Sequence, residues 1–182
     1  VLTAEKIFIN TGGRASVPAI RGLDQVPYLT NSSMMEVDFL PRHLVILGGS
    51  YIGLEFAQMY RRFGSKVTIV ERGARLIARE DPAVSDAIRA ILENEQIEVR
   101  LNADCIEVAK TAEGIEVKVD CGSGAKSVLG SHLLVAVGRQ PNTDDLGLEN
   151  TGIRRDRRGY IEVDDQLQTS VAGVWAMGDC NG

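Results

Sequence analysis

The sequence has few cysteines and histidines, and this scarcity excludes several kinds of chemistry. Its three cysteines, Cys105, Cys121 and Cys180, are far apart and form no CxxC or CxxxxC pair, so neither a disulfide framework nor a zinc site is encoded. The two histidines, His43 and His132, stand beside expected strands, where a surface or strand-start role is expected rather than metal ligation. A Ser-His-Asp arrangement has no support either. This cysteine usage predicts a protein of the reducing cytoplasm.

Long apolar runs and an excess of positive charge are also missing. No run approaches the roughly 20 residues that a membrane-spanning helix needs, and residues 1–6 lack the layout of a signal peptide. The net charge of −5 argues against nucleic acid as the main partner. With 44% hydrophobic residues among 182, the chain can bury a sizeable core. We therefore expect a globular protein that binds neither nucleic acid nor membrane.

The most informative stretch is residues 45–55, where an apolar strand runs directly into a glycine turn that opens a helix. Gly48 permits the tight turn out of the strand, and Gly53 lets helix and strand pack closely. The N–H groups of the first helical turn then face a pyrophosphate with the positive end of the helix dipole. This pattern predicts a dinucleotide site formed by Gly48, Gly49, Ser50, Tyr51, Ile52, Gly53 and Glu55.

Ser50 replaces the middle glycine of the G-x-G-x-x-G pattern. Its Cβ would crowd the phosphate and cost about 1–2 kcal/mol if the position requires φ > 0. Its hydroxyl would return about as much by hydrogen bonding a charged phosphate oxygen. The substitution weakens the motif without cancelling it.

The residues after the turn predict the second half of a strand–helix–strand unit. Ile52, Phe56, Met59 and Phe63 recur at helical spacing and are expected to form one buried apolar stripe. Gly64 stands where a left-handed C-terminal cap is expected. A helix is therefore predicted to end at this glycine.

A β-branched strand at residues 66–70 follows and ends on Glu71. The carboxylate lies close to the spacing of about 20 residues at which an acid accepts a hydrogen bond from the adenosine ribose 2′-hydroxyl. Because strand, helix, strand and acid occur in this order, we predict nucleotide binding rather than a plain tight turn.

A second helix is predicted after this unit. Asp81 is an N-cap and Pro82 the first helical residue. The helix is expected to end near Glu95. Its apolar face is formed by Val84, Ala87, Ile88, Ile91 and Leu92.

Short strands complete the pattern. Runs at residues 98–101, 105–108, 115–119 and 126–129 are separated by turns, and the last three indicate an antiparallel meander. Residues 132–137 are nearly all apolar, as expected of a strand buried on both faces of a parallel sheet. The fold class predicted is α/β, with a parallel sheet and a three-stranded antiparallel insert.

Two later motifs are Val-Gly-Arg-Gln-Pro-Asn-Thr at residues 137–143 and Val-Trp-Ala-Met-Gly-Asp at residues 174–179. Together with residues 11–13 and 48–55, they give the chain a resemblance to the pyridine nucleotide–disulfide oxidoreductases, the family of glutathione reductase, dihydrolipoamide dehydrogenase and mercuric reductase. The resemblance covers essentially the whole chain, with four motifs in the family's order. It implies a Rossmann-like FAD/NAD(P)-binding fold flanked by strands of the FAD domain.

The resemblance also implies a division of the chain. Residues 1–40 would be the end of an FAD-domain segment and a connector, residues 41–145 the NAD(P)-binding domain, and residues 146–182 the return into the FAD domain. Both ends are thus expected to continue into a longer parent, with a CxxxxC redox pair on one side and an interface domain with an acid–base histidine on the other. The expected partners are small-molecule dinucleotides, the chain's own FAD and interface domains, and a second copy in a homodimer.

The resemblance assigns roles near the flavin. Thr11 and Gly12 would contact FAD at the end of a strand, although Asn10 stands where the family usually has alanine. Asp179 would bind the FAD ribityl chain. Residues 138–139, Gly138 and Arg139, would lie between the nicotinamide and the flavin domain.

Two residues of the glycine turn would serve catalysis by the same resemblance. Tyr51 would lie over the nicotinamide pocket as a gate, with an ordinary helix-start aromatic as the alternative. Glu55 would pair with a lysine near flavin N5, and by itself it would also suit the first turn of a helix. The cofactors implied are FAD and a nicotinamide dinucleotide.

The choice between NADH and NADPH depends on Glu71. A carboxylate about 4 Å from a 2′-phosphate repels it, and this repulsion weakens NADPH binding by up to roughly 4 kcal/mol at an effective dielectric near 20. Arg72 and Arg75 act in the opposite direction, since NADP enzymes of the family place arginines in this loop. We expect NADH to be preferred, because Glu71 ends the strand that points at the ribose.

The function implied is delivery of hydride from NADH to FAD and on to a disulfide or metal-ion acceptor. An NADH oxidase or a ferredoxin reductase without a redox dithiol is an alternative parent, and a non-catalytic nucleotide-sensing module is a third. The sequence names no final acceptor. Cys180 follows Asp179 and is expected to be a small buried residue rather than a redox thiol.

Overall fold

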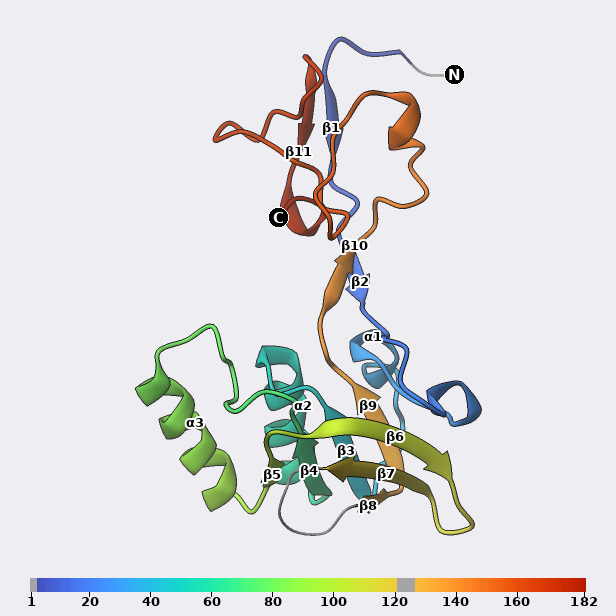
Figure 1. The fold of residues 1–182 in the computed structure, drawn as a ribbon, viewed down its shortest axis with the longest axis vertical. Coiled ribbons are helices and arrows are strands. Elements are labelled where there is room, and N and C mark those ends of the chain that lie inside the picture. The colour runs from blue at the N-terminus through green and yellow to red at the C-terminus, as the bar shows by residue number, and fades with distance from the viewer. Residues whose placement is uncertain (1–2, 121–126) are drawn as a thin grey trace. The chain divides into compact units, whose positions relative to one another are not determined.

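The computed structural model describes residues 3–120 and 127–182. Cys121 and Lys126, the expected start of the third run of the meander, lie outside these residues. The chain divides into a central unit, Val17–Gly138, and a flanking unit formed by Val1–Ser16 and Arg139–Gly182 (Figure 1). The three-part division expected from the sequence stays a prediction.

The central unit is built on a four-stranded sheet whose strands are all parallel (Figure 1). Alternate side chains of these strands enter two different apolar clusters, one on each face. The parallel sheet expected from the sequence is therefore confirmed. In spatial order its strands are β5 (Glu98–Arg100), β4 (Lys66–Val70), β3 (His43–Leu47) and β9 (His132–Val135).

Helix α2 (Tyr51–Phe63) packs on one face of this sheet and ends on Gly64, which has the left-handed backbone expected of a cap. The expected stripe is only partly correct. Met59 and Phe63 are 37% and 61% exposed, whereas Ala57 is fully buried. The buried face runs instead through Gly53, Phe56, Ala57 and Tyr60, because the small residues let the helix approach the sheet.

Helix α3 (Pro82–Asn94) begins as predicted. The Asp81 carboxylate accepts a hydrogen bond from the Ala83 N–H at 2.9 Å, with proline next to the cap. Its apolar face is less covered than expected, since Val84 and Ile91 are 43% and 51% exposed. The helix packs beside β5, a short edge strand that offers little surface to cover that face.

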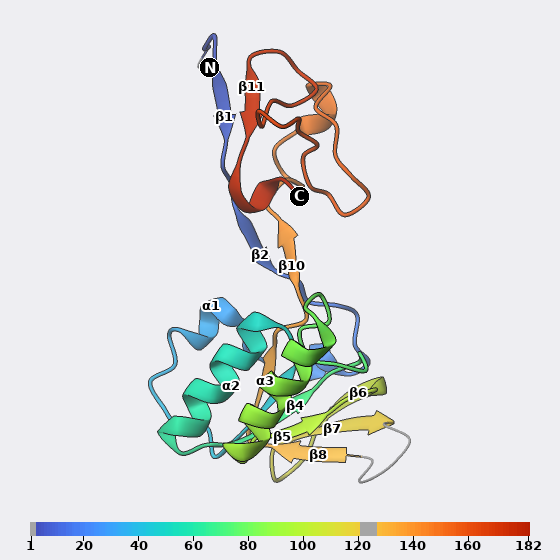
Figure 2. The same ribbon diagram turned by 90° about the vertical axis from the view of Figure 1, so that its left-hand side faces the viewer.

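The other face of the sheet carries the antiparallel meander, which is confirmed (Figure 2). Its strands are β6 (Asp104–Lys110), β7 (Ile115–Asp120) and β8 (Ser127–Gly130). The connector before β3 holds two short helices, η1 (Leu23–Gln25) and α1 (Asn31–Met34). No helix in the described part of the chain is long and apolar enough to cross a membrane.

The flanking unit consists of two small sheets and irregular segments. In the first, β1 (Ile7–Ile9) pairs with β11 (Val174–Ala176) in parallel; in the second, β2 (Gly13–Ala15) pairs with β10 (Arg139–Pro141) in antiparallel orientation. The unit also has two 3-10 helices, η2 (Leu148–Asn150) and η3 (Gly178–Cys180). Cys180 is fully buried in a small apolar cluster, so the burial expected for it is confirmed.

Candidate dinucleotide site

The turn between β3 and α2 is compact because two glycines permit close backbone contacts. Gly48 has a φ of 109°, and a Cβ there would lie 2.3 Å from the carbonyl oxygen of Ala136. A Cβ at Gly53 would lie 2.3 Å from the carbonyl oxygen of Gly48. The packing roles inferred for both glycines are confirmed, and any larger side chain would push the helix away from the strand.

Ser50 is the N-cap of α2, with φ −104° and ψ 179°. This extended backbone suits any L-residue, so the strain considered for Ser50 is absent. The side chain is exposed and makes no capping hydrogen bond. The N–H groups of Tyr51, Ile52 and Gly53, in the first turn, have no acceptor within the helix. Uncapped donors at the positive end of a helix fit the pyrophosphate of a dinucleotide.

Glu71 holds the glycine turn against the end of β4. One carboxylate oxygen accepts the Gly49 N–H at 2.6 Å, and the other accepts the Gly73 N–H at 2.6 Å. Each oxygen keeps a free lone pair. Both bonds fix the orientation of the carboxylate, and they leave it able to accept one more hydrogen bond, as from a ribose hydroxyl. No sequence pattern pointed to these two backbone contacts.

The connection from Glu71 to Glu80 lies against the same turn. The Ile77 N–H donates to the Gly49 carbonyl at 2.8 Å. A Cβ on Gly49 would lie only 2.6 Å from Cδ2 of Leu76. Both backbone groups of Gly49 are thus bound by residues of this connection. The sequence indicated only that it is the loop that carries Arg72 and Arg75.

Tyr51 and Glu55 border a groove of about 270 Å³ between α2 and α3. The Tyr51 ring is 49% exposed, and its hydroxyl donates a hydrogen bond to the Glu80 carboxylate. That bond raises the pKa of Tyr51. Further residues lining the groove are Leu54, Gln58, Ile77, Ile88, Ile91 and Leu92.

Glu55 is exposed and forms no ion pair within the described residues. The suggestion that it serves as a first-turn acid is wrong, because the first turn of α2 contains no acidic residue and Glu55 lies beyond it. Arg72 and Arg75 likewise have no ion-pair partner in residues 3–120 and 127–182.

The flanking unit brings a second set of predicted residues together. The Arg139 guanidinium donates to the Asp179 carboxylate at 2.8 Å and to the Gly13 carbonyl at 2.7 Å. A Cβ on Gly13 would lie 3.4 Å from Cβ of Asp179. Three motifs that are far apart in the sequence therefore meet within this unit. Gly138, the last residue of the central unit, has a φ of 150°.

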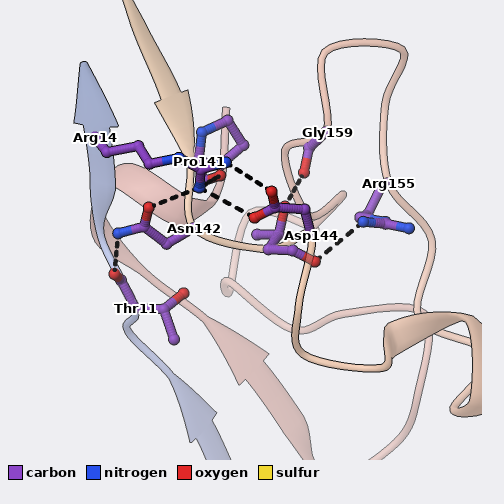
Figure 3. A network of polar contacts seen from close by, with 8 residues as sticks. Thr11, Arg14, Pro141, Asn142, Asp144, Arg155 and Gly159 are labelled. Atoms are coloured by element: carbon purple, nitrogen blue, oxygen red, sulfur yellow. Dashed lines mark hydrogen bonds and ion pairs between the residues drawn. The ribbon is translucent and has the colours of Figure 1, made fainter. Parts of the chain in front are cut away.

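Thr11 and Gly12, which lie between β1 and β2, are both bound by Asn142. Figure 3 shows the contact with Thr11. The Asn142 side chain donates to the Thr11 carbonyl at 3.0 Å, and its backbone N–H donates to the Gly12 carbonyl at 3.0 Å. Arg14 donates to Asp144 through both terminal nitrogens of its guanidinium group, at 3.0 and 2.6 Å. The hydrogen bonds from Arg14 lower the pKa of Asp144. Sequence reasoning missed Arg14 and Asp144, since they pair across 130 positions.

A polar row crosses the meander face of the central sheet. His43 Nε2 lies 2.9 Å from the Thr68 hydroxyl, which donates to Glu98 at 2.9 Å. Arg100 then donates to Glu98 at 2.8 Å. Burial lowers the pKa of His43. Burial alone would raise the pKa of Glu98, but the hydrogen bonds from Arg100 and Thr68 outweigh it and lower that pKa.

Both histidines therefore stand at strand starts, as expected. His132, at the start of β9, also has a pKa lowered by burial. In the part of the chain that the structure describes, no three His, Cys, Asp or Glu side chains gather as a metal would require.

Comparison with known proteins gives a consistent result. The family model described as "Pyridine nucleotide-disulphide oxidoreductase" matches residues 1–182. Mercuric reductase of Streptomyces lividans is 43% identical over 176 residues, which are 97% of this chain and 37% of that protein. The probable pyridine nucleotide-disulfide oxidoreductase RclA of Escherichia coli is 42% identical over 179 residues, which are 98% of this chain and 40% of that protein.

The chain is also similar to solved structures. The Cu(II) complex of the HOCl-induced flavoprotein disulfide reductase RclA from Escherichia coli matches with a TM-score of 0.86 at 42% identity, over 97% of this chain and 39% of that one. LpdA from Mycobacterium tuberculosis matches with a TM-score of 0.85 at 30% identity, over 98% of this chain and 38% of that one. The chain thus spans about two fifths of the length of these relatives.

Proposed function

Since this chain belongs to the pyridine nucleotide-disulphide oxidoreductase family, we propose that it is the NAD(P)H-binding domain of an FAD-dependent oxidoreductase. The observation that carries the proposal is the turn at the start of α2, where uncapped N–H donors lie beside the fixed carboxylate of Glu71. When bound, the two cofactors supply hydride transfer from nicotinamide to flavin and electron transfer on to a disulfide or a metal ion.

The residues of the central unit would bind and orient the dinucleotide. The first-turn N–H groups of α2 and the Ser50 hydroxyl would hold the pyrophosphate. Glu71 would accept a hydrogen bond from the adenosine ribose. Tyr51 would cover the nicotinamide pocket, and the unpaired carboxylate of Glu55 would meet a cation from another part of the parent protein.

The residues of the flanking unit would serve FAD. Asp179 would hold the ribityl chain, and the Arg139 guanidinium already keeps that carboxylate in place through a hydrogen bond of 2.8 Å. The strand end at Thr11 and Gly12 would approach the flavin cofactor. Its backbone carbonyls are bound by Asn142, so its conformation is set before any cofactor arrives.

NADH is the nucleotide we propose, because the negative charge of Glu71 is held at the strand end by two backbone N–H groups. A 2′-phosphate about 4 Å away would be disfavoured by up to roughly 4 kcal/mol at an effective dielectric near 20. Arg72 and Arg75 reduce this penalty without removing it. The preference therefore depends on Glu71 staying in its present position.

Calorimetric titration of the 182-residue chain with NADH and with NADPH tests these assignments. The expected result is binding of both nucleotides, with NADH the tighter. Tighter binding of NADPH would overturn the preference for NADH, whereas failure to bind either nucleotide would overturn the proposed function.

The acceptor is proposed from the relatives, which include mercuric reductases and a flavoprotein disulfide reductase. A parent of this kind would carry a CxxxxC redox pair upstream of Val1 and would form a homodimer. Sequencing the parent gene upstream of that residue is the direct test. A CxxxxC pair would support a disulfide or metal-ion acceptor, and its absence would favour an oxidase or an electron-transfer flavoprotein.

A further inference from the structure

Exposed apolar side chains gather along one flank of α2, away from the candidate dinucleotide site. Met59 and Phe63 are four positions apart, so they lie on the same face of the helix, and both are exposed. Gly64 caps the helix, and a Cβ there would lie 3.8 Å from Cδ2 of Leu40, which is half-exposed. Leu40 therefore extends the apolar surface of α2 onto the connector that precedes β3.

The same surface reaches the end of α1 through the buried Tyr60. The Tyr60 hydroxyl donates to the Met34 carbonyl at 3.5 Å, and its ring lies edge-on to that of Phe63, with 5.8 Å between the ring centroids. Met35, directly after Met34, is exposed. Large apolar residues that adjoin one another on a surface mark interaction sites, whereas single ones need no explanation. The name α2 patch is used below for the four exposed residues Met35, Leu40, Met59 and Phe63.

Charges of opposite sign stand at the two ends of the connector beside this patch. Glu36 and Asp38 follow α1. Arg42 comes directly before β3, and its carbonyl accepts the N–H of Lys66, the first residue of β4, at 3.1 Å. All four side chains are exposed, and none forms an ion pair within residues 3–120 and 127–182. The α2 patch therefore has an acidic end and a basic end, and both ends are open to a partner.

We propose that the α2 patch binds a second copy of this chain, patch against patch about a twofold axis. Both copies use the same surface in such an interface. When the two connectors run antiparallel, the acidic end of each patch meets the basic end of the other, so the charges at both ends find partners of opposite sign. A partner surface of one sign would place a like charge against one of the ends, and the acids Glu36 and Asp38 would repel nucleic acid or an anionic membrane. The charge pattern therefore favours a second copy.

This contact is separate from nucleotide binding and from the homodimer proposed for the parent. The patch adjoins the start of β3, whereas the glycine turn follows the end of that strand. Every residue of the patch lies in the central unit. In a parent that already forms a homodimer, a second twofold contact of this kind would join dimers into larger assemblies.

Sedimentation velocity of the 182-residue chain, at concentrations from about 1 μM to about 1 mM, tests the contact. We expect a reversible monomer–dimer equilibrium, whether or not NADH is present. Phe63→Glu should raise the dimer Kd at least about 10-fold, because it buries an unpaired charge in an apolar contact. Phe8→Glu in β1 is the matched control, since Phe8 is 59% and Phe63 61% exposed, and its Kd should stay within about 2-fold of wild type. A chain that stays monomeric throughout, or a dimer that both variants weaken equally, would overturn the proposal.

An exchange of charges tests the antiparallel arrangement. A basic version of the chain carries Glu36→Lys and Asp38→Lys, and an acidic version carries Arg42→Glu and Lys66→Glu. Each version alone should have a dimer Kd raised at least about 10-fold, because like charges then meet across the twofold axis. An equimolar mixture of the two should form the heterodimer, since opposite charges meet again at both ends, and this recovery also shows that both versions are folded. A mixture that stays monomeric, or a single version that dimerises like wild type, would contradict the proposed interface.

Discussion

The central and flanking units are stabilised by different kinds of contact. In the central unit, two apolar clusters lie on opposite faces of a parallel sheet, and residues such as Ile46 and Val67 are completely buried. The flanking unit has one small apolar cluster and leaves Ile7 and Phe8 of β1 48% and 59% exposed. Hydrogen bonds between distant segments, such as Arg14 with Asp144, join its parts instead.

This difference affects the two candidate sites. The turn before α2 directly follows four fully buried residues of β3, so its geometry is set by close packing that depends little on solvent conditions. Residues near Asp179 are held largely by exposed polar contacts, which salt screens. The candidate dinucleotide site should therefore keep its geometry at salt concentrations that weaken the contacts near Asp179.

The largest expected effect compares one isoleucine in each unit. Ile69 in β4 is fully buried, and Ile69→Ala should lower the free energy of unfolding by about 2–5 kcal/mol, because it removes apolar contacts and leaves a cavity. Ile7→Ala in β1, which starts 48% exposed, should change it by no more than about 0.5 kcal/mol. Urea denaturation of both variants measures the two changes in the free energy of unfolding. Equal decreases in the two variants would contradict the predicted difference between the units.

Substitution of Glu71 should change nucleotide binding more than stability. Glu71→Ala leaves the Gly49 and Gly73 N–H groups without their acceptor, and we expect the Kd for NADH to rise about 10-fold or more. Glu71→Gln removes the charge, and it should shift the NADPH-to-NADH affinity ratio about 10-fold toward NADPH.

Calorimetry with both nucleotides measures these changes. Glu113→Gln, which alters an exposed acid without an ion pair among the described residues, is the control. An unchanged affinity ratio in Glu71→Gln would show that Glu71 does not select the nucleotide.

A smaller effect is expected from the polar network of the flanking unit. Arg14→Ala removes the two-point bond to Asp144 and the bond to Asn142, so limited proteolysis should cut this unit faster than in wild type. The difference should shrink at about 1 M salt, where screening already weakens the exposed pair. Arg157→Ala, an exposed arginine with no ion pair in the described residues, should be cut at the wild-type rate.

The smallest expected effect is a pH dependence confined to the central unit, which holds both histidines. Burial and the charge of Lys66 lower the pKa of His43 in the folded chain. As the pH falls below the ordinary value of 6.5, the unfolded chain therefore takes up the proton first, and the free energy of unfolding decreases. His43→Gln should flatten this decrease in urea denaturations between about pH 5 and 8. An equal slope in wild type and variant would contradict the assignment.

Local signals explain what was predicted correctly. Gly64 ends α2 because glycine adopts the left-handed backbone of a helix cap without strain, and Asp81 with Pro82 begins α3 because both residues suit the start of a helix. The apolar run at β9 indicated a strand buried on both faces. Each of these features depends on neighbours within a few positions, so the sequence alone contains the necessary information.

Side-chain burial on the helices was less predictable. Met59 and Phe63 have the spacing of a buried stripe, yet both are exposed, while Ala57 is fully buried. Periodicity identifies a helix and an approximate apolar face, but the partner surface decides which edge of that face is covered. Small residues are favoured where α2 lies closest to the sheet. The hydrophobicity of single residues does not indicate where this closest approach falls.

The sequence by itself determined the strand–turn–helix unit, the glycines that permit it, the acid at the end of the next strand and the family to which these motifs belong. The tertiary structure alone decided which distant groups those residues bind: Glu71 with Gly49, Tyr51 with Glu80, and Arg139 with Asp179. The physical reason is the separation along the chain of the residues that interact. Backbone conformation and capping depend on adjacent residues, whereas a hydrogen bond between groups tens of positions apart exists only after the packed strands and helices have brought its donor and acceptor within about 3 Å.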